Sequence, residues 1–129
     1  MVSRTIRATA ICFGCALAGF VLAGSSDADV VSVGLNSAMP AKLGVSEQFA
    51  HSGKWVGSNA AADFEPTIGG PTSVNISAGG LVTVTFNSPA DLAGKVIVLT
   101  PSDGGHGKVN WACKASGEFP LGVLPKQCQ

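Results

Sequence analysis

The sequence predicts an α+β fold, in which one N-terminal helix packs on a four-stranded antiparallel sheet and a disulfide closes a C-terminal loop. Three observations lead to this expectation. Apolar or small residues recur at three- and four-residue intervals between 31 and 49, and the period changes to two between 73 and 115. The last two Cys then bracket a stretch rich in Gly and Pro. A helix followed by a run of strands is typical of α+β domains.

The first 28 residues are expected to be a signal peptide or leader rather than part of the fold. Two Arg within the first seven residues precede an apolar or small run over 8–24, and small residues follow. Basic, apolar and small segments in this order are typical of a secretory signal. Cleavage between Ala28 and Asp29 would leave a globular domain of residues 29–129. An apolar run of about 17 residues is short for a bilayer span, so we expect only transient contact with the membrane.

The expected helix has one apolar or small face, formed by Val31, Leu35, Ala38, Val45 and Phe49. Lys42 stands where this stripe would continue, and Pro40 and Gly44 interrupt it. Two interpretations of Pro40 remain open. If Ser37 is the N-cap, Pro40 falls in the first turn, where its missing N–H matters little; otherwise Pro40 kinks the helix. Gly53 is expected to end the element.

The four expected strands alternate apolar and polar residues or are apolar through their centre, over 73–77, 81–87, 95–101 and 108–115. Two of the runs flank Ala78-Gly79-Gly80, which predicts a β-hairpin. The stretches 56–70, 88–94 and 102–107 are expected to be loops and turns. In the last strand, Val109 and Trp111 should share one face.

The cysteines divide between the leader and the domain. Cys12 and Cys15 form a C-x-x-C, but this motif lies inside the apolar run with no preceding strand, which disfavours redox chemistry. Removal of the leader leaves Cys113 and Cys128. In an exported chain, an oxidising compartment makes a disulfide between them the default. Closing a loop of about 15 residues contributes roughly 3 kcal/mol in the chain-entropy model.

Composition and motifs argue against several classes of function. The formal net charge is zero and the Lys residues are scattered, so no nucleic acid is expected as a partner. His51 and His106 are expected to be solvated loop residues, and Asp63 and Glu65 to be exposed to water. No Cys or His cluster has metal-ligand spacing, and no phosphate loop or nucleophile elbow is present. We therefore expect no enzyme activity, no cofactor and no metal site.

The predicted elements, in this order, resemble the globular head of a type IV pilin. "LNSAMPAKLGVSEQFAHSGKW" is similar to the second half of a pilin's long helix and its exit. "VTVTF" and "LAGKVIVLTP" resemble the central strands, and "VNWACKA" with "LPKQC" resembles the disulfide-bounded C-terminal loop. The resemblance covers roughly residues 30–129.

The resemblance implies that Trp111 is a core residue, which we expect to pack with Phe49, Val82, Val84 and Phe86. It also implies that the Cys113–Cys128 loop is the exposed region that varies among pilins and serves adhesion or subunit contacts. The candidate contact residues of this loop are Lys114, Glu118, Phe119, Leu121 and Lys126. The implied partners are other pilin subunits, or a surface or receptor.

The N-terminus departs from the pilin pattern, in which a Gly precedes the cleavage point, Phe follows, and a Glu occupies the fifth mature position. Gly19 and Phe20 match that site only faintly, Gly24 stands in the fifth place, and "SSDAD" interrupts the apolar spine. Two hypotheses follow, beside that of an enzyme or redox protein, for which the motifs above give no support. The chain is a pilus subunit or minor pilin-like component, or it is a soluble exported pilin-head domain, periplasmic or extracellular, that binds through the Cys113–Cys128 loop. A mature chain starting at Phe20 favours the first, and one starting at Asp29 the second.

Overall fold

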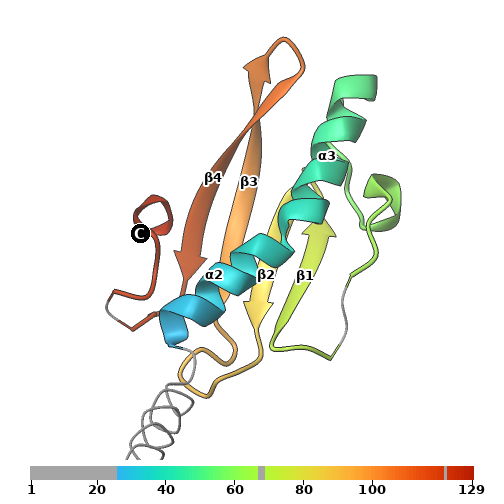
Figure 1. Ribbon diagram of the computed structural model, residues 1–129. Coiled ribbons are helices and arrows are strands. Elements are labelled where there is room, and N and C mark those ends of the chain that lie inside the picture. Colours follow the sequence, from blue (N-terminus) through green and yellow to red (C-terminus); the bar gives the residue numbers. More distant parts are fainter. Residues whose placement is uncertain (1–25, 67–68, 121) are drawn as a thin grey trace, which may run out of the picture.

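The computed structural model describes residues 26–66, 69–120 and 122–129, and it confirms the predicted α+β class (Figure 1). Two consecutive helices, α2 (Asp27–Ser37) and α3 (Met39–Ser52), form a helical arm across one face of an antiparallel sheet. The strands are neighbours in chain order: β1 (Thr72–Ser77), β2 (Leu81–Phe86), β3 (Val96–Gly105) and β4 (Lys108–Ser116). Two short 3₁₀ helices complete the fold, η1 (Ala60–Ala62) and η2 (Lys126–Cys128).

Helix α2 begins with a capping box made by Ser26 and Asp29. The hydroxyl of Ser26 accepts a hydrogen bond from the backbone N–H of Asp29 (3.2 Å), and the Asp29 carboxylate accepts one from the N–H of Ser26 (3.1 Å). These bonds satisfy N–H groups at the start of the helix, and the acidic Asp27 and Asp29 also suit the positive end of the helix dipole. The described part of the arm therefore starts at a cap of its own.

The arm passes from α2 to α3 at Ala38, which ends one helix and begins the next. Pro40 lies in the first turn of α3, so the first-turn interpretation is confirmed. The expected N-cap Ser37 is wrong, because its hydroxyl instead donates to the carbonyl oxygen of Gly34 (2.6 Å). Helix α3 ends where predicted, with Gly53 in the left-handed conformation (φ 73°).

The side of the arm that faces the sheet is lined by small or β-branched residues: Val31, Gly34, Ala38, Ala41, Gly44 and Val45. A Cβ atom on Gly34 would lie 2.7 Å from Cε1 of Phe86, and one on Gly44 would meet the carbonyl oxygen of Ala62. Both glycines therefore allow an approach of backbone to neighbour that a side chain would prevent.

The core lies between the arm and the facing side of the sheet. Alternate residues of β1 to β3 are buried there: Thr72, Val74, Ile76, Val82, Val84, Phe86, Ile97, Leu99 and Pro101. Across the sheet, Val84 lies opposite Val74 on β1 and Ile97 on β3, so apolar side chains meet in rows. Strand β4 alternates in the same way, but its arm-facing residues are only half-buried.

The four strands lie where the sequence predicted them, but the last hairpin is longer than expected. Strand β3 continues to Gly105, and a register shift falls between Asp103 and Gly105. The expected connection 102–107 therefore shrinks to a turn at His106 and Gly107, both with positive φ (55° and 76°). Two residues with positive φ match the twist of a tight hairpin.

Trp111 lies on the arm-facing side of β4 and packs against the core, as expected, although it is only half-buried. Val82, Val84 and Phe86 belong to the same core. The expectation for Phe49 is wrong, because its ring stacks on Trp55 (centroids 3.9 Å apart, planes at 10°). The chain reverses direction after α3, and this brings the Trp55 ring back onto the last turns of that helix.

Candidate functional site

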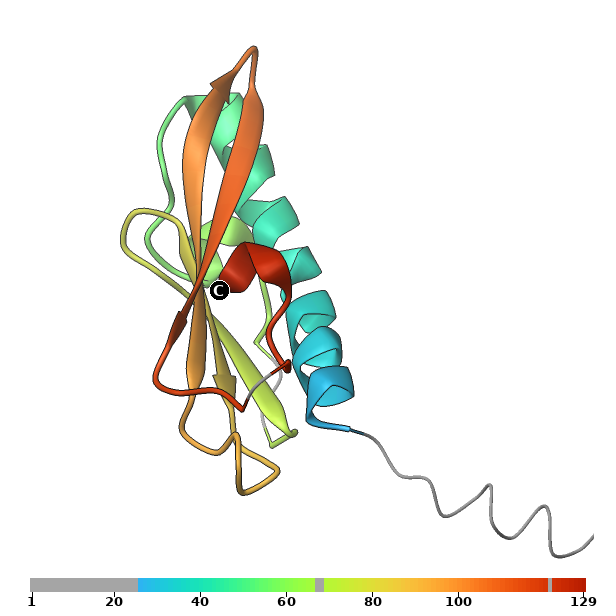
Figure 2. The same cartoon turned by 90° about the vertical axis from the view of Figure 1, so that its left-hand side faces the viewer.

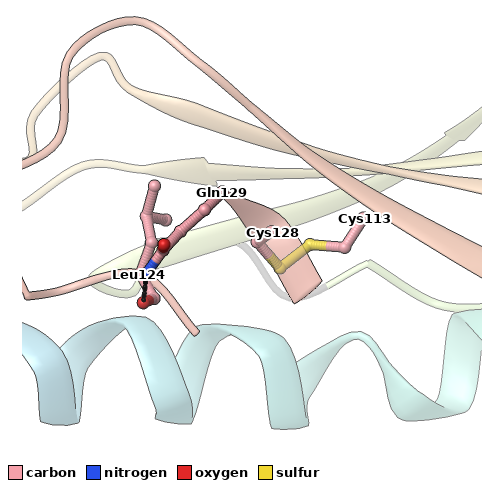
Figure 3. Close-up of a disulfide and its surroundings, with 4 residues drawn as sticks. All are labelled: Cys113, Leu124, Cys128 and Gln129. Carbon is pink, nitrogen blue, oxygen red and sulfur yellow. Dashed lines mark hydrogen bonds between the residues drawn. A yellow bond between two sulfur atoms is a disulfide. The ribbon is translucent and has the colours of Figure 1, made fainter. Parts of the chain in front are cut away.

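The C-terminal segment, residues 117–129, is joined to β4 by the predicted disulfide between Cys113 and Cys128 (Figure 3). The Cα atoms of the two cysteines are 4.6 Å apart. Cys113 is half-buried on the arm-facing side of β4, whereas Cys128, in η2, is 2% exposed and belongs to the core. The disulfide therefore ties the segment to the buried interior rather than to the surface.

Non-covalent contacts hold the same segment in place. The Phe119 ring meets the Phe86 ring edge-on (centroids 5.9 Å apart, planes at 85°), and Val123 and Leu124 pack against the core. The Gln129 side-chain N–H donates to the carbonyl oxygen of Leu124 (3.0 Å), as Figure 3 shows. The segment is thus packed onto the sheet, and Figure 2 shows η2 beside β4 on the side of the helical arm.

The predicted contact residues of the loop lie in different surroundings. Lys114 is exposed on the side of β4 that faces away from the arm, Glu118 is exposed just after β4, and Lys126 is exposed in η2. Phe119 is half-buried and directs its ring toward Phe86. Leu121 lies outside the described residues. Among the four described residues of this set, the three charged side chains are therefore the most accessible to solvent and to a partner.

The predicted cleavage site, Ala28 and Asp29, lies in the first turn of α2, and Asp29 belongs to the capping box. The basic and apolar parts of the predicted leader, with Cys12 and Cys15, lie outside the described residues. Within residues 26–66, 69–120 and 122–129, no helix is both long enough and apolar enough to cross a bilayer.

The residues considered for chemistry do not gather into a site. His51 and His106 are exposed, one at the end of α3 and the other in the β3–β4 turn, and Asp63 and Glu65 are exposed in the loop after η1. In the part of the chain that the structure describes, no group of three or more His, Cys, Asp or Glu residues is arranged to hold a metal ion.

A groove runs between the arm and the C-terminal segment. Its larger part has a volume of about 420 Å³, with Val31 and Leu35 on the arm side and Leu124 and Gln127 opposite. An adjoining part of about 210 Å³ shares Leu35 and Gln127 and continues to Lys42 and Trp111. We refer to the two parts together as the long groove. Its wall combines apolar side chains with the amides of Asn36 and Gln127.

Lys42 stands at one end of the long groove, with its Nζ atom 5.5 Å from the centre of the Trp111 ring. An ammonium group over an indole face is a cation–π contact, which at exposed positions contributes about 0.5–1 kcal/mol. The sequence pattern did not indicate this pair. In the sequence, Lys42 is only an interruption of the apolar stripe. Its proximity to Trp111 follows from how the arm crosses β4.

Three large hydrophobic residues of the arm, Val33, Met39 and Leu43, are 56–59% exposed. They do not share one side of the arm, because Val33 borders Pro71 and Thr72 near β1, whereas Met39 lines the long groove beside Lys42 and Trp111. No charged residue occurs between positions 30 and 41 of the chain. The exposed polar residues Ser32, Asn36 and Ser37 stand among the exposed apolar ones, so the solvent-facing side of α2 is uncharged but mixed in polarity.

Comparison with known proteins shows which family has this architecture. A family model described as pilin, a bacterial filament protein, matches residues 30–129, which include both helices of the arm from Val30 onward, all four strands and the disulfide. A search of curated proteins gives no match. The matched region covers well over half of the chain, and it coincides with the arm, the sheet and the closed C-terminal segment described above. The chain belongs to the pilin family of bacterial filament proteins.

Proposed function

We propose that this protein is a structural subunit of a type IV pilus-like filament whose disulfide-closed C-terminal segment contacts neighbouring subunits or a surface receptor. Family membership supports the structural role in a pilus. The proposed contact through the C-terminal segment rests on one observation. The Cys113–Cys128 bond fixes the segment, while Lys114, Glu118 and Lys126 remain exposed. A surface held rigid before binding loses less conformational entropy when it binds.

The subunit role is tested in cells that produce the full chain. Filaments are sheared from the cells, collected by centrifugation and examined by mass spectrometry. We expect peptides of residues 29–129 in the filament fraction. Recovery of the chain only outside this fraction, from cells that do carry filaments, would contradict the proposal.

Contact through the C-terminal segment is tested with the double variant Lys114→Ala/Lys126→Ala. We expect weaker attachment of filament-bearing cells to surfaces with an unchanged amount of filament, because only exposed charges are removed. The matched control is Lys54→Ala/Lys108→Ala, which removes two exposed charges elsewhere in the described chain. Equal attachment of both variants and the parent would assign adhesion to another surface.

A second candidate function is a soluble exported pilin-head domain that binds a partner through the same segment. The acidic residues in the first turn of α2 favour it, because Asp27 and Asp29 place ionised groups where a pilin has its apolar spine. An ionised carboxylate in hydrocarbon costs several kcal/mol. In this case cleavage after Ala28 would release a domain of residues 29–129 into the periplasm or the medium.

Intact mass of the mature chain separates the two candidates. A chain that begins at Phe20 and pellets with filaments supports the pilus subunit. A chain that begins at Asp29 and is recovered in the soluble periplasmic or secreted fraction supports the released domain. Such cleavage would also remove Ser26 and with it the side-chain cap of α2, so α2 of the released domain should fray at its first turn.

A further inference from the structure

Among the described residues that line the long groove, Lys42 is the only charged one. No Asp or Glu occurs in the remaining stretches of the chain, 1–25, 67–68 and 121. The groove therefore has one positive charge at its end and no carboxylate of this chain in its wall to balance that charge. A cleft lined by one sign of charge attracts a group of the opposite sign.

Two side-chain amides stand beside this charge. Asn36, on α2, and Gln127, in η2, are exposed and line the same part of the groove as Lys42. In the described chain neither amide donates a hydrogen bond, whereas that of the neighbouring Gln129 donates to Leu124. An ammonium and two amides can donate to the two oxygens of one carboxylate, and hydrogen bonds to an ionised acceptor are the stronger kind.

Apolar side chains form much of the rest of the wall. Leu99, which is 5% exposed, and Trp111 line the smaller part of the groove. Past Leu35, the larger part, of about 420 Å³, adds Val31 and Leu124. Clefts of about 300–1,000 Å³ that combine apolar walls with a few polar groups are typical of small-molecule sites, in which the polar groups fix the orientation of the ligand.

We propose that the long groove binds an amphipathic monocarboxylate, with its carboxylate beside Lys42 and its unbranched apolar chain along the groove toward Val31. A carboxylate matches the charge, whereas a phosphate monoester would bring about two negative charges to a single ammonium. A peptide would bury backbone N–H and C=O groups, for which this wall offers few partners. The inference goes beyond the proposed function, because it assigns a small ligand to the head and does not depend on filament assembly.

Fluorescence titration of the mature protein tests this binding. In a Trp55→Phe variant, Trp111 is the only Trp of the chain. Decanoate, kept below the concentration at which it forms micelles, should cause a saturable change in Trp111 emission, because it displaces water beside the indole. Decanamide has the same chain without the charge and should bind about tenfold more weakly, a change of one decade in the dissociation constant. Equal binding of the two, or no saturable change with decanoate, overturns the proposal.

Substitution of Lys42 tests which group recognises the carboxylate. Lys42→Met keeps an apolar stem and removes the charge, so it should weaken decanoate binding about tenfold and leave decanamide binding unchanged. Lys42→Arg should keep most of the affinity. The matched control is Lys54→Met, which removes an exposed charge just after α3 and outside the groove. If Lys42→Met binds decanoate as the parent does, the assignment of Lys42 is wrong.

Chain length tests the apolar part of the ligand. Hexanoate should bind at least about tenfold more weakly than decanoate, because fewer methylene groups leave water. Equal binding of decanoate, hexanoate and acetate would show that the site recognises charge alone and would contradict an amphipathic ligand. These measurements use the single folded chain, so their failure leaves the proposed subunit role standing, and absence of the chain from filaments leaves their outcome unchanged.

Discussion

In both β2 and β4, residues that face the arm alternate with residues on the other side of the sheet, yet the two strands are stabilised by different means. In β2 every second residue is fully buried, namely Val82, Val84 and Phe86, whereas no residue of β4 is. Strand β2 has a neighbour on each side and the arm above it, while β4 is an edge of the sheet. The disulfide and the C-terminal segment cover β4 instead. A small domain can therefore complete one side of its core with a covalent closure where apolar residues are scarce.

The largest effect is expected in β2. Phe86→Ala should lower the free energy of unfolding by about 3–5 kcal/mol, because the ring is fully buried and contacts Phe119. Urea denaturation followed by circular dichroism measures this change. Thr85→Ala, on the opposite side of the same strand, is the control and should stay within about 0.5 kcal/mol. A loss for Phe86→Ala no larger than the control would contradict the contrast between the two strands.

Breaking the covalent closure should have the next largest effect. Cys113→Ser and Cys128→Ser should each destabilise the domain by roughly 2–5 kcal/mol, the range for native disulfides in small secreted domains. The double variant should lose no more than either single one, because both remove the same bond. Alkylation of the mature protein under denaturing, non-reducing conditions is a direct check, and two reactive thiols would disprove the bond.

The close approach of the arm to β2 gives a third prediction. Gly34→Ala should cost about 1–3 kcal/mol, because the added methyl group would overlap the Phe86 ring. Asn36→Ala is the control, since Asn36 is exposed on the same helix and Ala favours helix formation. Thermal unfolding of both variants measures the difference. A stabilised Gly34→Ala variant would show that the arm can move away from the sheet without loss.

The smallest of these effects is expected on the arm-facing side of β4. Trp111→Ala should cost about 1–2 kcal/mol, below the ~3–5 kcal/mol of fully buried aromatics, because the indole is only half-buried. In a Trp55→Phe background, Trp111 fluorescence should have a maximum between those of buried and fully solvated indoles. A water-like maximum would contradict its packing against the core.

Local periodicity and cysteine placement were sufficient to predict the helix, the four strands and the Cys113–Cys128 bond. The errors arise where distant parts of the chain meet. The helical stripe correctly includes Val45, but the expected packing of Phe49 with Trp111 is wrong, because periodicity cannot reveal that Trp55 returns to stack on the Phe49 ring. The turn between β3 and β4 is shorter than expected, because β3 continues past a register shift. Composition gives no sign of this shift.

The candidate site was predictable only in part. The sequence identified the segment between the two Cys, and its charged residues Lys114, Glu118 and Lys126 are exposed. The long groove and the Lys42–Trp111 contact could not be predicted, because both depend on how the arm crosses β4. The roles assigned to the loop residues and to the cleavage point at Ala28 remain predictions.

The side of the sheet that faces away from the arm has a chemistry of its own. On β1 and β2 it presents hydroxyl and amide side chains in facing pairs, Ser73 opposite Thr85 and Asn75 opposite Thr83. In β1 and β2, residues that form the core therefore alternate with residues that form the exterior of the domain. Ser73 and Asn75 also accept hydrogen bonds from Asn87 and Asn59, which tie loops to the sheet. Thr83 and Thr85 make no such bond in the described chain, so the exterior can change there while the core beneath keeps its shape.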